Sequence, residues 1–470
     1  MSLIKIKNIL LNAQNGGMIM VQNNEKVHSS ARDRLVSLFD GGTFVELSAY
    51  AKRKGGEPES VCCGYGAIGG KLTFAFAQDG EADGGVFSDR QAKKISSLYS
   101  LAIKNGAPVI GVFDSKGVSI LDGAAALGAY GKLMSDVSRA SGVIPQIAII
   151  DGVCGGAAAV AASMFDFAVT VKDKSKLFVK APFVTGKAID NKQAGHTAYE
   201  AADAADAVKF ARGLVSILPS NNAECIAVDA ADDINRAVSG QTADTAALLS
   251  EICDGGSFVR LYEGYSQNMI FGFGSFGGVL AGVVASNSKT DGALDIKSVR
   301  AAAKLMSFCD SFSIPVLTLV DSVGAVVSAE AEENSYAEEL ARLAFAYAAF
   351  DNAKVTVITG KAYGSAFSIL GSKSIGADMV YGLPASEISV LSPEASVAFL
   401  WNGKVGERSR EELEKEWRDS VASADMAAEN GEIDDVIDPS EFRQRICAAL
   451  LMLCSKAEGA PSRKHINMPL

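Results

Sequence analysis

Two stretches of small residues follow apolar segments and have the composition needed to stabilise a negative charge. The first is 147–158 (IAIIDGVCGGAA) and the second, at an offset of 208 residues, is 355–366 (VTVITGKAYGSA). In each, a strand-like apolar run ends at a glycine, small residues follow, and an apolar helix rich in small residues comes next. Small side chains at a helix start let backbone N–H groups approach an oxyanion, with the positive end of the helix behind them. Close helix packing would also favour glycine and alanine, but the repetition after matching strands favours an oxyanion site.

Histidine, a side chain that often performs acid–base or metal chemistry, is scarce. The only histidines are His28, His196 and His465, and no two are near in sequence, so histidine-rich metal sites are not expected. No G-x-S-x-G motif occurs, and the eight cysteines form no C-x-x-C pair, which is typical of reduced, mostly buried thiols. An enzyme of this composition is expected to stabilise charge with backbone groups and a bound cofactor rather than with imidazole.

A glycine motif gives the first information on the elements that position these stretches. Residues 64–69 (GYGAIG) match the G-x-G-x-x-G fingerprint of dinucleotide-binding folds, which requires a helix after it. The next residues, 71–77 (KLTFAFA), alternate in polarity as a strand does. The pattern therefore predicts a β-hairpin rather than a nucleotide-binding turn. A second copy, 272–278 (GFGSFGG), is also followed by an apolar run.

Further matches at nearly the same offset indicate an internal duplication. Residues 40–47 (DGGTFVEL) match 254–261 (DGGSFVRL), and 108–117 (PVIGVFDSKG) match 315–324 (PVLTLVDSVG). Helical periodicity follows each predicted hairpin, and in the first half it begins at a capping-box pattern, SDRQ. The alternation of strands and helices predicts two α/β domains of one fold, 1–240 and 241–470.

Composition and charge limit the classes of partner. The 470 residues are 48% apolar, as in a globular protein of two domains, and the net charge of −11 argues against nucleic acid or an anionic membrane as a partner. No run approaches the roughly 20 apolar residues of a spanning helix, and the N-terminus does not have a signal-peptide pattern. The sequence therefore predicts a cytoplasmic location.

Over nearly its whole length the chain resembles the carboxyltransferase subunits of biotin-dependent acyl-CoA carboxylases and of sodium-pumping acyl-CoA decarboxylases. The segments that carry this resemblance occur in the family's order. They are 104–109 (KNGAPV), 141–146 (SGVIPQ), 218–222 (LPSNN), 354–359 (KVTVIT), 361–364 (KAYG), 431–439 (GEIDDVIDP) and 463–470 (RKHINMPL).

The resemblance implies two tandem crotonase-like (ββα spiral) domains and a homo-oligomer, at least a dimer and in many members a hexamer. Active sites would lie where the N-terminal domain of one subunit faces the C-terminal domain of another. The thioester of coenzyme A would bind mainly to the N-terminal domain and carboxybiotin to the C-terminal domain. On the family's pattern, Gly156 and Ala157 form one oxyanion hole, for the enolate, and Ser365 and Ala366, beside Gly364, form the other, for the ureido oxygen. The base is then the ureido group of biotin, and no metal is required.

The resemblance also suggests residues that bind the ligands. Four lysines could bind coenzyme A phosphates, although such a cluster is also typical of a solvated edge: Lys172, Lys174, Lys176 and Lys180. Phe367 and Ser368, which follow the second small-residue stretch, are further candidates for binding the cofactor, and Ser368 falls where the family adjusts its choice of acyl chain.

The chain has no M-K-M biotinylation motif and no ATP-binding carboxylase domain. Biotin would therefore arrive on a separate biotin carboxyl carrier protein. The other partners would be a biotin carboxylase subunit or the membrane subunits of a decarboxylase, in which case the chain would be peripheral on that complex.

Departures from the family's pattern leave alternatives open. The family's arginine in D-S-G-G-A-R-I-Q-E-G is replaced by Ser119, and its V-P-G-F-L-P-G loop is replaced by 322–328 (SVGAVVS). The leading hypothesis is carboxyl transfer to acetyl- or propionyl-CoA. One alternative is the reverse transfer, from methylmalonyl-, malonyl- or glutaconyl-CoA to biotin, and another is a non-catalytic scaffold that keeps the fold.

Overall fold

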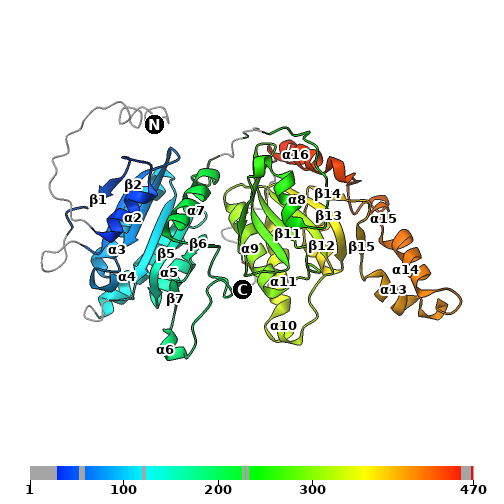
Figure 1. Cartoon of the computed structure of the whole chain (residues 1–470), viewed down its shortest axis with the longest axis horizontal. Helices are drawn as coiled ribbons and strands as arrows, with labels where there is room; N and C mark the ends of the chain where they lie inside the picture. The colour runs from blue at the N-terminus through cyan, green and yellow to red at the C-terminus, as the bar shows by residue number, and fades with distance from the viewer. Residues whose placement is uncertain are drawn as a thin grey trace. The chain divides into compact units, whose positions relative to one another are not determined.

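The computed structural model of the chain describes residues 29–51, 59–118, 123–224, 228, 232–456 and 467–468. Contacts between residues divide the chain into two compact units (Figure 1). Unit 1 comprises Met1–Asn191 and Glu200–Asn221, and unit 2 comprises Lys192–Tyr199 and Asn222–Leu470. Residues 222–240 thus group with unit 2, and a boundary between duplicated domains at residue 240 stays a prediction.

Unit 1 is built around one mixed sheet with the strand order β1-β2-β3-β4-β5-β6-β8, in which β7 pairs with β5. The strands β1 to β3 are antiparallel, and those from β3 to β6 are parallel. The bounds are β1 Val45–Leu47, β2 Val61–Ile68, β3 Lys71–Gln78, β4 Val109–Ser115, β5 Gln146–Gly155, β6 Phe167–Val171, β7 Lys176–Phe178 and β8 Tyr199–Ala201.

Unit 2 repeats this topology. Its sheet has the order β16-β14-β13-β12-β11-β10-β9, with β15 paired to β13, and the change from antiparallel to parallel pairing falls at β11, the counterpart of β3. The bounds are β9 Val259–Leu261, β10 Met269–Phe276, β11 Val279–Ser286, β12 Val316–Ser322, β13 Lys354–Tyr363, β14 Met379–Gly382, β15 Glu387–Ser389 and β16 Asp435–Val436. The shared order of pairing confirms the predicted duplication.

The glycine motif forms a hairpin, as predicted. Gly69 and Gly70 make the two-residue turn between β2 and β3, with φ of 55° and 78°, which suits the turns that connect twisted strands. The carboxylate of Asp40 accepts their N–H groups at 3.3 and 3.1 Å. Asp254 does the same for Gly277 and Gly278 of unit 2, at 2.9 and 2.7 Å.

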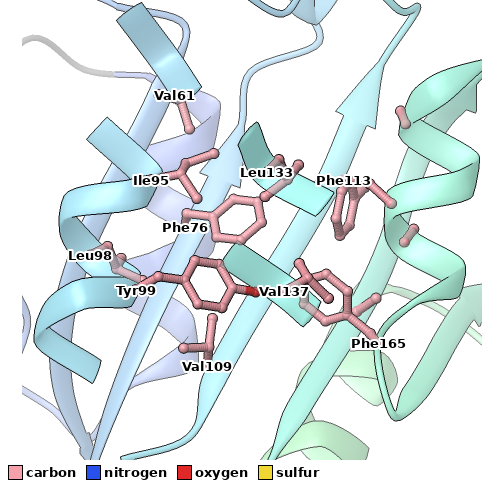
Figure 2. Packing of buried hydrophobic residues seen from close by; sticks show 14 of the residues in the cluster. Val61, Phe76, Ile95, Leu98, Tyr99, Val109, Phe113, Leu133, Val137 and Phe165 are labelled. Atoms are coloured by element: carbon pink, nitrogen blue, oxygen red, sulfur yellow. The ribbon is translucent and has the colours of Figure 1, made fainter. Parts of the chain in front are cut away.

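Helices pack against the unit 1 sheet, and the short helix α6 lies on a loop beyond it (Figure 1). The helices of this unit are α2 Ser30–Leu38, α3 Asp89–Asn105, α4 Ala124–Ala140, α5 Ala157–Ser163, α6 Pro182–Thr185 and α7 Ala204–Ile217. The main core lies between the sheet and the layer of α3, α4 and α5. Figure 2 shows Ile95 and Tyr99 of α3 beside Phe76 and Val109 of the strands.

The predicted capping box at the start of α3 is only half correct. The Ser88 hydroxyl accepts the N–H of Gln91 at 3.5 Å, as expected for an N-cap. The Gln91 side chain, however, donates to Ser60 Oγ and to the Val86 carbonyl, at 2.6 and 2.9 Å. The Gln91 amide nitrogen therefore donates to these two acceptors instead of to the N-cap residue, and its buried Oε1 has no hydrogen-bond partner among the described residues.

Unit 2 has a similar helical layer and an additional helical extension after β15. The helices are α8 Thr245–Ile252, α9 Ile296–Ser311, α10 Ala329–Glu333, α11 Tyr336–Ala349, α12 Ser365–Ile369, α13 Pro393–Leu400, α14 Arg410–Trp417, α15 Ala424–Glu429 and α16 Phe442–Leu453. Between α14 and α15 lies a π-helical turn, Arg418–Ala422. No helix of the described residues is long and apolar enough to span a membrane.

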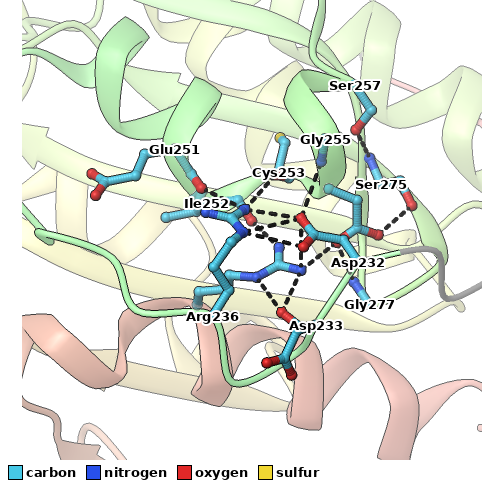
Figure 3. Close-up of polar contacts among 12 residues, drawn as sticks. Asp232, Asp233, Arg236, Glu251, Ile252, Cys253, Gly255, Ser257, Ser275 and Gly277 are labelled. Atoms are coloured by element: carbon cyan, nitrogen blue, oxygen red, sulfur yellow. Dashed lines mark hydrogen bonds and ion pairs between the residues drawn. The ribbon is translucent and has the colours of Figure 1, made fainter.

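A partly buried ion-pair network ties residues 232–236 to the hairpin of unit 2 (Figure 3). Arg443 of α16 is fully buried, bonds Asp254 at 2.7 Å, and donates to the carbonyls of Asp233 and Ile252. Arg236 pairs with Asp232 at 3.0 Å. The network therefore anchors the turn that Asp254 organises.

Candidate active site

The aspartates of the repeated D-S motifs shape the ends of the neighbouring strands. Asp114 Oδ1 accepts the N–H of Val153 on β5 at 3.3 Å, and a Cβ at Gly152 would lie 2.1 Å from that oxygen. Asp321 Oδ1 accepts the N–H of Lys361 on β13 at 2.9 Å, and a Cβ at Gly360 would lie 2.3 Å from that oxygen. In both units the pairing with the preceding strand shifts register at this point. These carboxylates therefore support the strand ends from which the small-residue turns begin.

The first turn connects β5 to α5. Gly156 has φ 62° and ψ −125°, a conformation that side-chain-bearing residues rarely adopt, and its N–H donates to the Phe178 carbonyl of β7 at 2.9 Å. The N–H groups of Ala157 and Ala158 have no acceptor among the described residues. The turn therefore presents two backbone donors at the start of α5.

The second turn connects β13 to α12 and has nearly the same backbone. Gly364 has φ 50° and ψ −116°, and its N–H donates to the Ser389 carbonyl of β15 at 3.0 Å. Ser365 and Ala366 then present N–H groups that have no acceptor within the described part of the chain. Ala366 is fully buried, whereas Ser365 is half-buried.

These contacts correct one detail of the sequence-based assignment. Gly156 was expected to donate a hydrogen bond into an oxyanion hole, but its N–H is already bonded to Phe178. Gly156 and Gly364 instead supply the backbone conformation, and the donors left for a ligand are the residues that follow them. Ser368, which was expected near an acyl chain, donates its hydroxyl to the Gly364 carbonyl at 3.2 Å, and Phe367 beside it is half-buried.

A cavity of about 860 Å³ opens at the second turn. Gly364 and Ser365 line it, together with an apolar wall and a polar cluster. The apolar wall consists of Val326, Val327, Val390 and Leu391. The residues 323–327, where the chain departs from the family's loop, therefore line the cavity directly.

The polar cluster joins a phenol, two carboxylates and a guanidinium. The Tyr363 hydroxyl bonds to Glu387, whose other oxygen lies 2.6 Å from Nε of Arg418. Arg418 also reaches Glu394 of α13, at 3.3 Å. Burial raises the pKa of Tyr363, and the hydrogen bond to Glu387 and its charge raise it further, so the phenol stays protonated at neutral pH.

The four candidate lysines lie around β7, but they differ in their contacts. Lys176 begins β7, which pairs with β5, and Lys180 lies just beyond its end. The ammonium of Lys174 is paired with Asp151 at 2.6 Å, whereas the side chains of Lys172, Lys176 and Lys180 are exposed. Lys176 and Lys180 thus flank Phe178, the residue that accepts the Gly156 N–H.

Comparing the two turns position by position adds Tyr363, Glu387 and Lys116 to the residues of interest beside the turns. In the strand registers, Lys176 of β7 occupies the place of Glu387 in β15, and Gly155 occupies the place of Tyr363. In the repeated D-S-x-G motif, Lys116, which is exposed, occupies the position that Val323 has in unit 2. Differences between repeats are visible in the sequence, but their proximity to the turns depends on the pairing of β7 and β15.

Some expected features lie elsewhere or outside the described residues. Ser119, at the place of the family's arginine, is outside the described residues, as are His28 and His465. Among the residues that the structure does describe, no group of three or more histidine, cysteine or carboxylate side chains could hold a metal ion. Burial raises the pKa values of the thiols of Cys253 and Cys447 to about 12 and about 11, so both stay protonated at neutral pH.

Comparisons with known proteins show the family to which the chain belongs. The carboxyl transferase domain family matches residues 22–468. The propionyl-CoA carboxylase beta chain of Saccharopolyspora erythraea is 34% identical, with 96% of this chain and 92% of the relative covered. The methylmalonyl-CoA decarboxylase subunit alpha of Veillonella parvula is also 34% identical, with 95% of each covered.

A solved structure of transcarboxylase 12S superimposes on the whole chain with a TM-score of 0.87 and 29% identity, covering 100% of both chains. That protein is described as a hexamer assembly and was solved with methylmalonyl-coenzyme A and methylmalonic acid bound. The likeness confirms the predicted fold of two tandem crotonase-like domains. On this match over nearly the entire chain, the protein belongs to the carboxyl transferase domain family, as the sequence predicted.

Proposed function

We propose that the protein transfers a carboxyl group between biotin, carried on a separate protein, and the α-carbon of a short-chain acyl-CoA. The observation that carries this proposal is the pair of matching turns, each with two N–H donors at a helix start that have no acceptor in the described part of the chain. Carboxyl transfer to a thioester develops negative charge on two oxygens, one on each reactant, and fixed N–H donors stabilise such charge. The family of the chain supports the same reaction.

The acyl-CoA is assigned to the turn of unit 1. Loss of the α-proton leaves an enolate oxygen, which the Ala157 N–H would meet with α5 behind it. Lys176 and Lys180 are exposed beside this turn and would face the phosphates of coenzyme A. In unit 2 the position of Lys176 is occupied by Glu387, whose negative charge would repel these phosphates.

Biotin is assigned to the cavity of unit 2. When bound, it supplies a carboxyl group activated on a ureido nitrogen. The apolar wall formed by Val326, Val327, Val390 and Leu391 suits an uncharged ring, and the cavity volume is within the usual range for small-ligand sites. Ser365 and Ala366 would donate to the ring carbonyl, and this oxygen is the one that gains charge when the carboxyl leaves.

The same residues would serve transfer in either direction. Relatives named as carboxylases and as decarboxylases are equally similar, at 34% identity, so methylmalonyl-CoA or malonyl-CoA as carboxyl donor is the second candidate. The proposal also requires a biotin carboxyl carrier protein and either a biotin carboxylase or membrane decarboxylase subunits. The proposal includes a homo-oligomer of at least two subunits, and the hexamer assembly of transcarboxylase 12S supports this.

A carboxyl-exchange assay tests the proposal. The purified chain is incubated with free biotin and with methylmalonyl-, malonyl- or glutaconyl-CoA, and the decarboxylated thioester is measured by chromatography. We expect biotin-dependent conversion of at least one thioester, and the preferred thioester identifies the acyl group. The absence of conversion, together with no binding of acyl-CoAs or biotinylated carrier at millimolar concentration, would favour the scaffold alternative.

A further inference from the structure

The second turn depends on β15, a strand of only three residues. Its register with β13 sets Lys361 opposite Glu387 and Tyr363 opposite Ser389. The Ser389 carbonyl accepts the Gly364 N–H at 3.0 Å, so the position of β15 determines how the following N–H donors are aimed. A strand this short forms few backbone hydrogen bonds, and side-chain contacts therefore have a large influence on its position.

Side-chain contacts of this kind converge on Glu387. The Tyr363 hydroxyl reaches it from the end of β13, and Arg418 reaches it at 2.6 Å from the π-helical turn. Arg418 also contacts Glu394 on α13 at 3.3 Å. All four side chains line the cavity that contains Gly364 and Ser365. The cluster thus connects three elements to the strand that holds the turn.

Unit 1 provides an internal control for the role of this cluster. Its turn forms the same hydrogen bond, from Gly156 to Phe178 at 2.9 Å, but Gly155 and Lys176 occupy the positions of Tyr363 and Glu387. The fold therefore builds this turn without a phenol or a carboxylate. The cluster is an addition at the one turn that opens into the described 860 Å³ cavity.

We propose that Tyr363, Glu387 and Arg418 are positioning residues that orient the N–H donors of Ser365 and Ala366 toward the ligand of this cavity. This inference rests on the proposed function for the identity of the ligand, biotin. The carboxylate of Glu387 fixes β15 through Tyr363, and Arg418 holds that carboxylate in place and balances its charge. The cluster acts through the backbone and does not contact the reacting atoms.

The test combines two readouts on the full chain for the variants Tyr363→Phe, Glu387→Gln and Arg418→Met. The first is amide hydrogen exchange of the peptides that contain Gly364 and Gly156, measured by mass spectrometry without any ligand. The second is the KM for free biotin and for the acyl-CoA, measured separately in the exchange assay. Arg418→Lys tests rescue, because it retains the charge beside Glu387.

A matched control is Arg408→Met. Arg408 lies on the same helical extension and pairs with Glu416 on the surface, without lining the cavity. We expect the three variants to speed exchange at Gly364 at least fivefold and to raise the KM for biotin about tenfold. Exchange at Gly156 and the KM for acyl-CoA should stay within twofold, as should all values for Arg408→Met.

Each other result overturns the inference. Unchanged exchange at Gly364 shows that the cluster does not hold the turn, whether or not the wild type is active. Faster exchange with equal changes in both KM values, or with a lower unfolding temperature and no rescue by Arg418→Lys, shows a general structural role. A wild type without transfer activity contradicts the proposed function, while the exchange readout still decides whether the cluster holds the turn.

Discussion

At the scale of single residues, the turn glycines matter through their backbone conformation. Gly156 has φ 62° and ψ −125°, and a Cβ there would meet no atom within 4 Å, so an alanine is opposed only by backbone strain. Such strain is on the order of 1–3 kcal/mol, and relaxing it would rotate the Ala157 N–H away from its direction. The substitution should therefore affect catalysis more than packing.

We expect Gly156→Ala to fold and to lose about 100-fold in carboxyl-exchange rate, the effect of losing one oxyanion donor. The measurement is the exchange assay alongside thermal unfolding. Gly431→Ala is the control, because Gly431 also has a positive φ, 77°, and open space around it, but it follows α15 and belongs to neither turn. Equal activity of the two variants would remove the first turn from the site.

The lysines beside β7 make a second prediction at this scale. Lys176→Met combined with Lys180→Met should raise the KM for acyl-CoA at least tenfold, because a hydrogen bond between charged groups contributes about 1.5–3 kcal/mol. The KM for the same acyl group on pantetheine, which has no phosphates, should stay unchanged. Lys209→Met, an exposed lysine on α7, is the control. A parallel rise for both thioesters would show that these lysines do not bind phosphate.

At the scale of elements, the fit between β4 and β5 depends on the absence of a side chain at Gly152. A Cβ at Gly152 would lie 2.1 Å from Asp114 Oδ1, which also holds the Val153 N–H, while the other carboxylate oxygen bonds Arg34 at 3.0 Å. We expect Gly152→Ala to lower the free energy of unfolding by about 1–3 kcal/mol, because overpacking displaces a carboxylate with several partners. Unfolding by denaturant measures this change in the free energy of unfolding.

The control for this prediction is Gly128→Ala, within helix α4. A Cβ at Gly128 would meet nothing within 4 Å, and the residue is exposed. Alanine there should stabilise the protein by about 0.5–1 kcal/mol, because glycine is a poor helix former. A Gly152→Ala variant as stable as the wild type would show that Asp114 can move freely.

At the scale of the whole molecule, each unit has its own arginine–aspartate anchor for the hairpin turn. Arg212 pairs with Asp40 in unit 1 at 2.6 Å, and Arg443 pairs with Asp254 in unit 2 at 2.7 Å. Arg443 is fully buried, so Arg443→Met would leave Asp254 without its charge partner, at a cost of about 3–5 kcal/mol. Both tryptophans, Trp401 and Trp417, belong to unit 2.

Tryptophan fluorescence therefore follows the unfolding of unit 2. We expect Arg443→Met to shift the fluorescence transition to lower denaturant concentration. Arg212→Met should leave this transition in place and change only the part of the circular dichroism signal that comes from unit 1. A similar shift of the fluorescence transition by both substitutions would indicate that the two units unfold as one.

Acidification should weaken the same network. The hydrogen bond from Arg236 and that from the Gly255 N–H lower the pKa of Asp232 from 3.8 to about 2. Burial alone would raise the pKa of Asp254, but its bonds from Gly278, Arg443 and Gly277 outweigh burial and lower it. Carboxyls with a lowered pKa stabilise the fold above about pH 4, and this stabilisation is lost as the pH falls through their folded pKa values. The free energy of unfolding of unit 2 should therefore fall between pH 4 and pH 2, and less steeply in Arg443→Met.

The sequence alone was sufficient for the family, the duplication and the place of both turns. These features can be recognised in short stretches of sequence, because a hairpin, a buried strand and a helix start each restrict the residue types at fixed spacing. The duplication repeats each of these patterns in the second half of the chain. Gly69 and Gly70 show this: their hairpin could be predicted from the strand pattern of 71–77 and from the twin at 272–278.

The tertiary structure decided which groups remain available for chemistry. The Gly156 N–H is occupied by Phe178, 22 residues later in the chain, and Lys174 by Asp151, although both were candidates by residue type. The cluster of Tyr363, Glu387 and Arg418 draws on three elements that only folding brings together. The physical reason is that local sequence specifies backbone conformation, whereas a donor or a charge is free or satisfied according to partners that are distant in the chain.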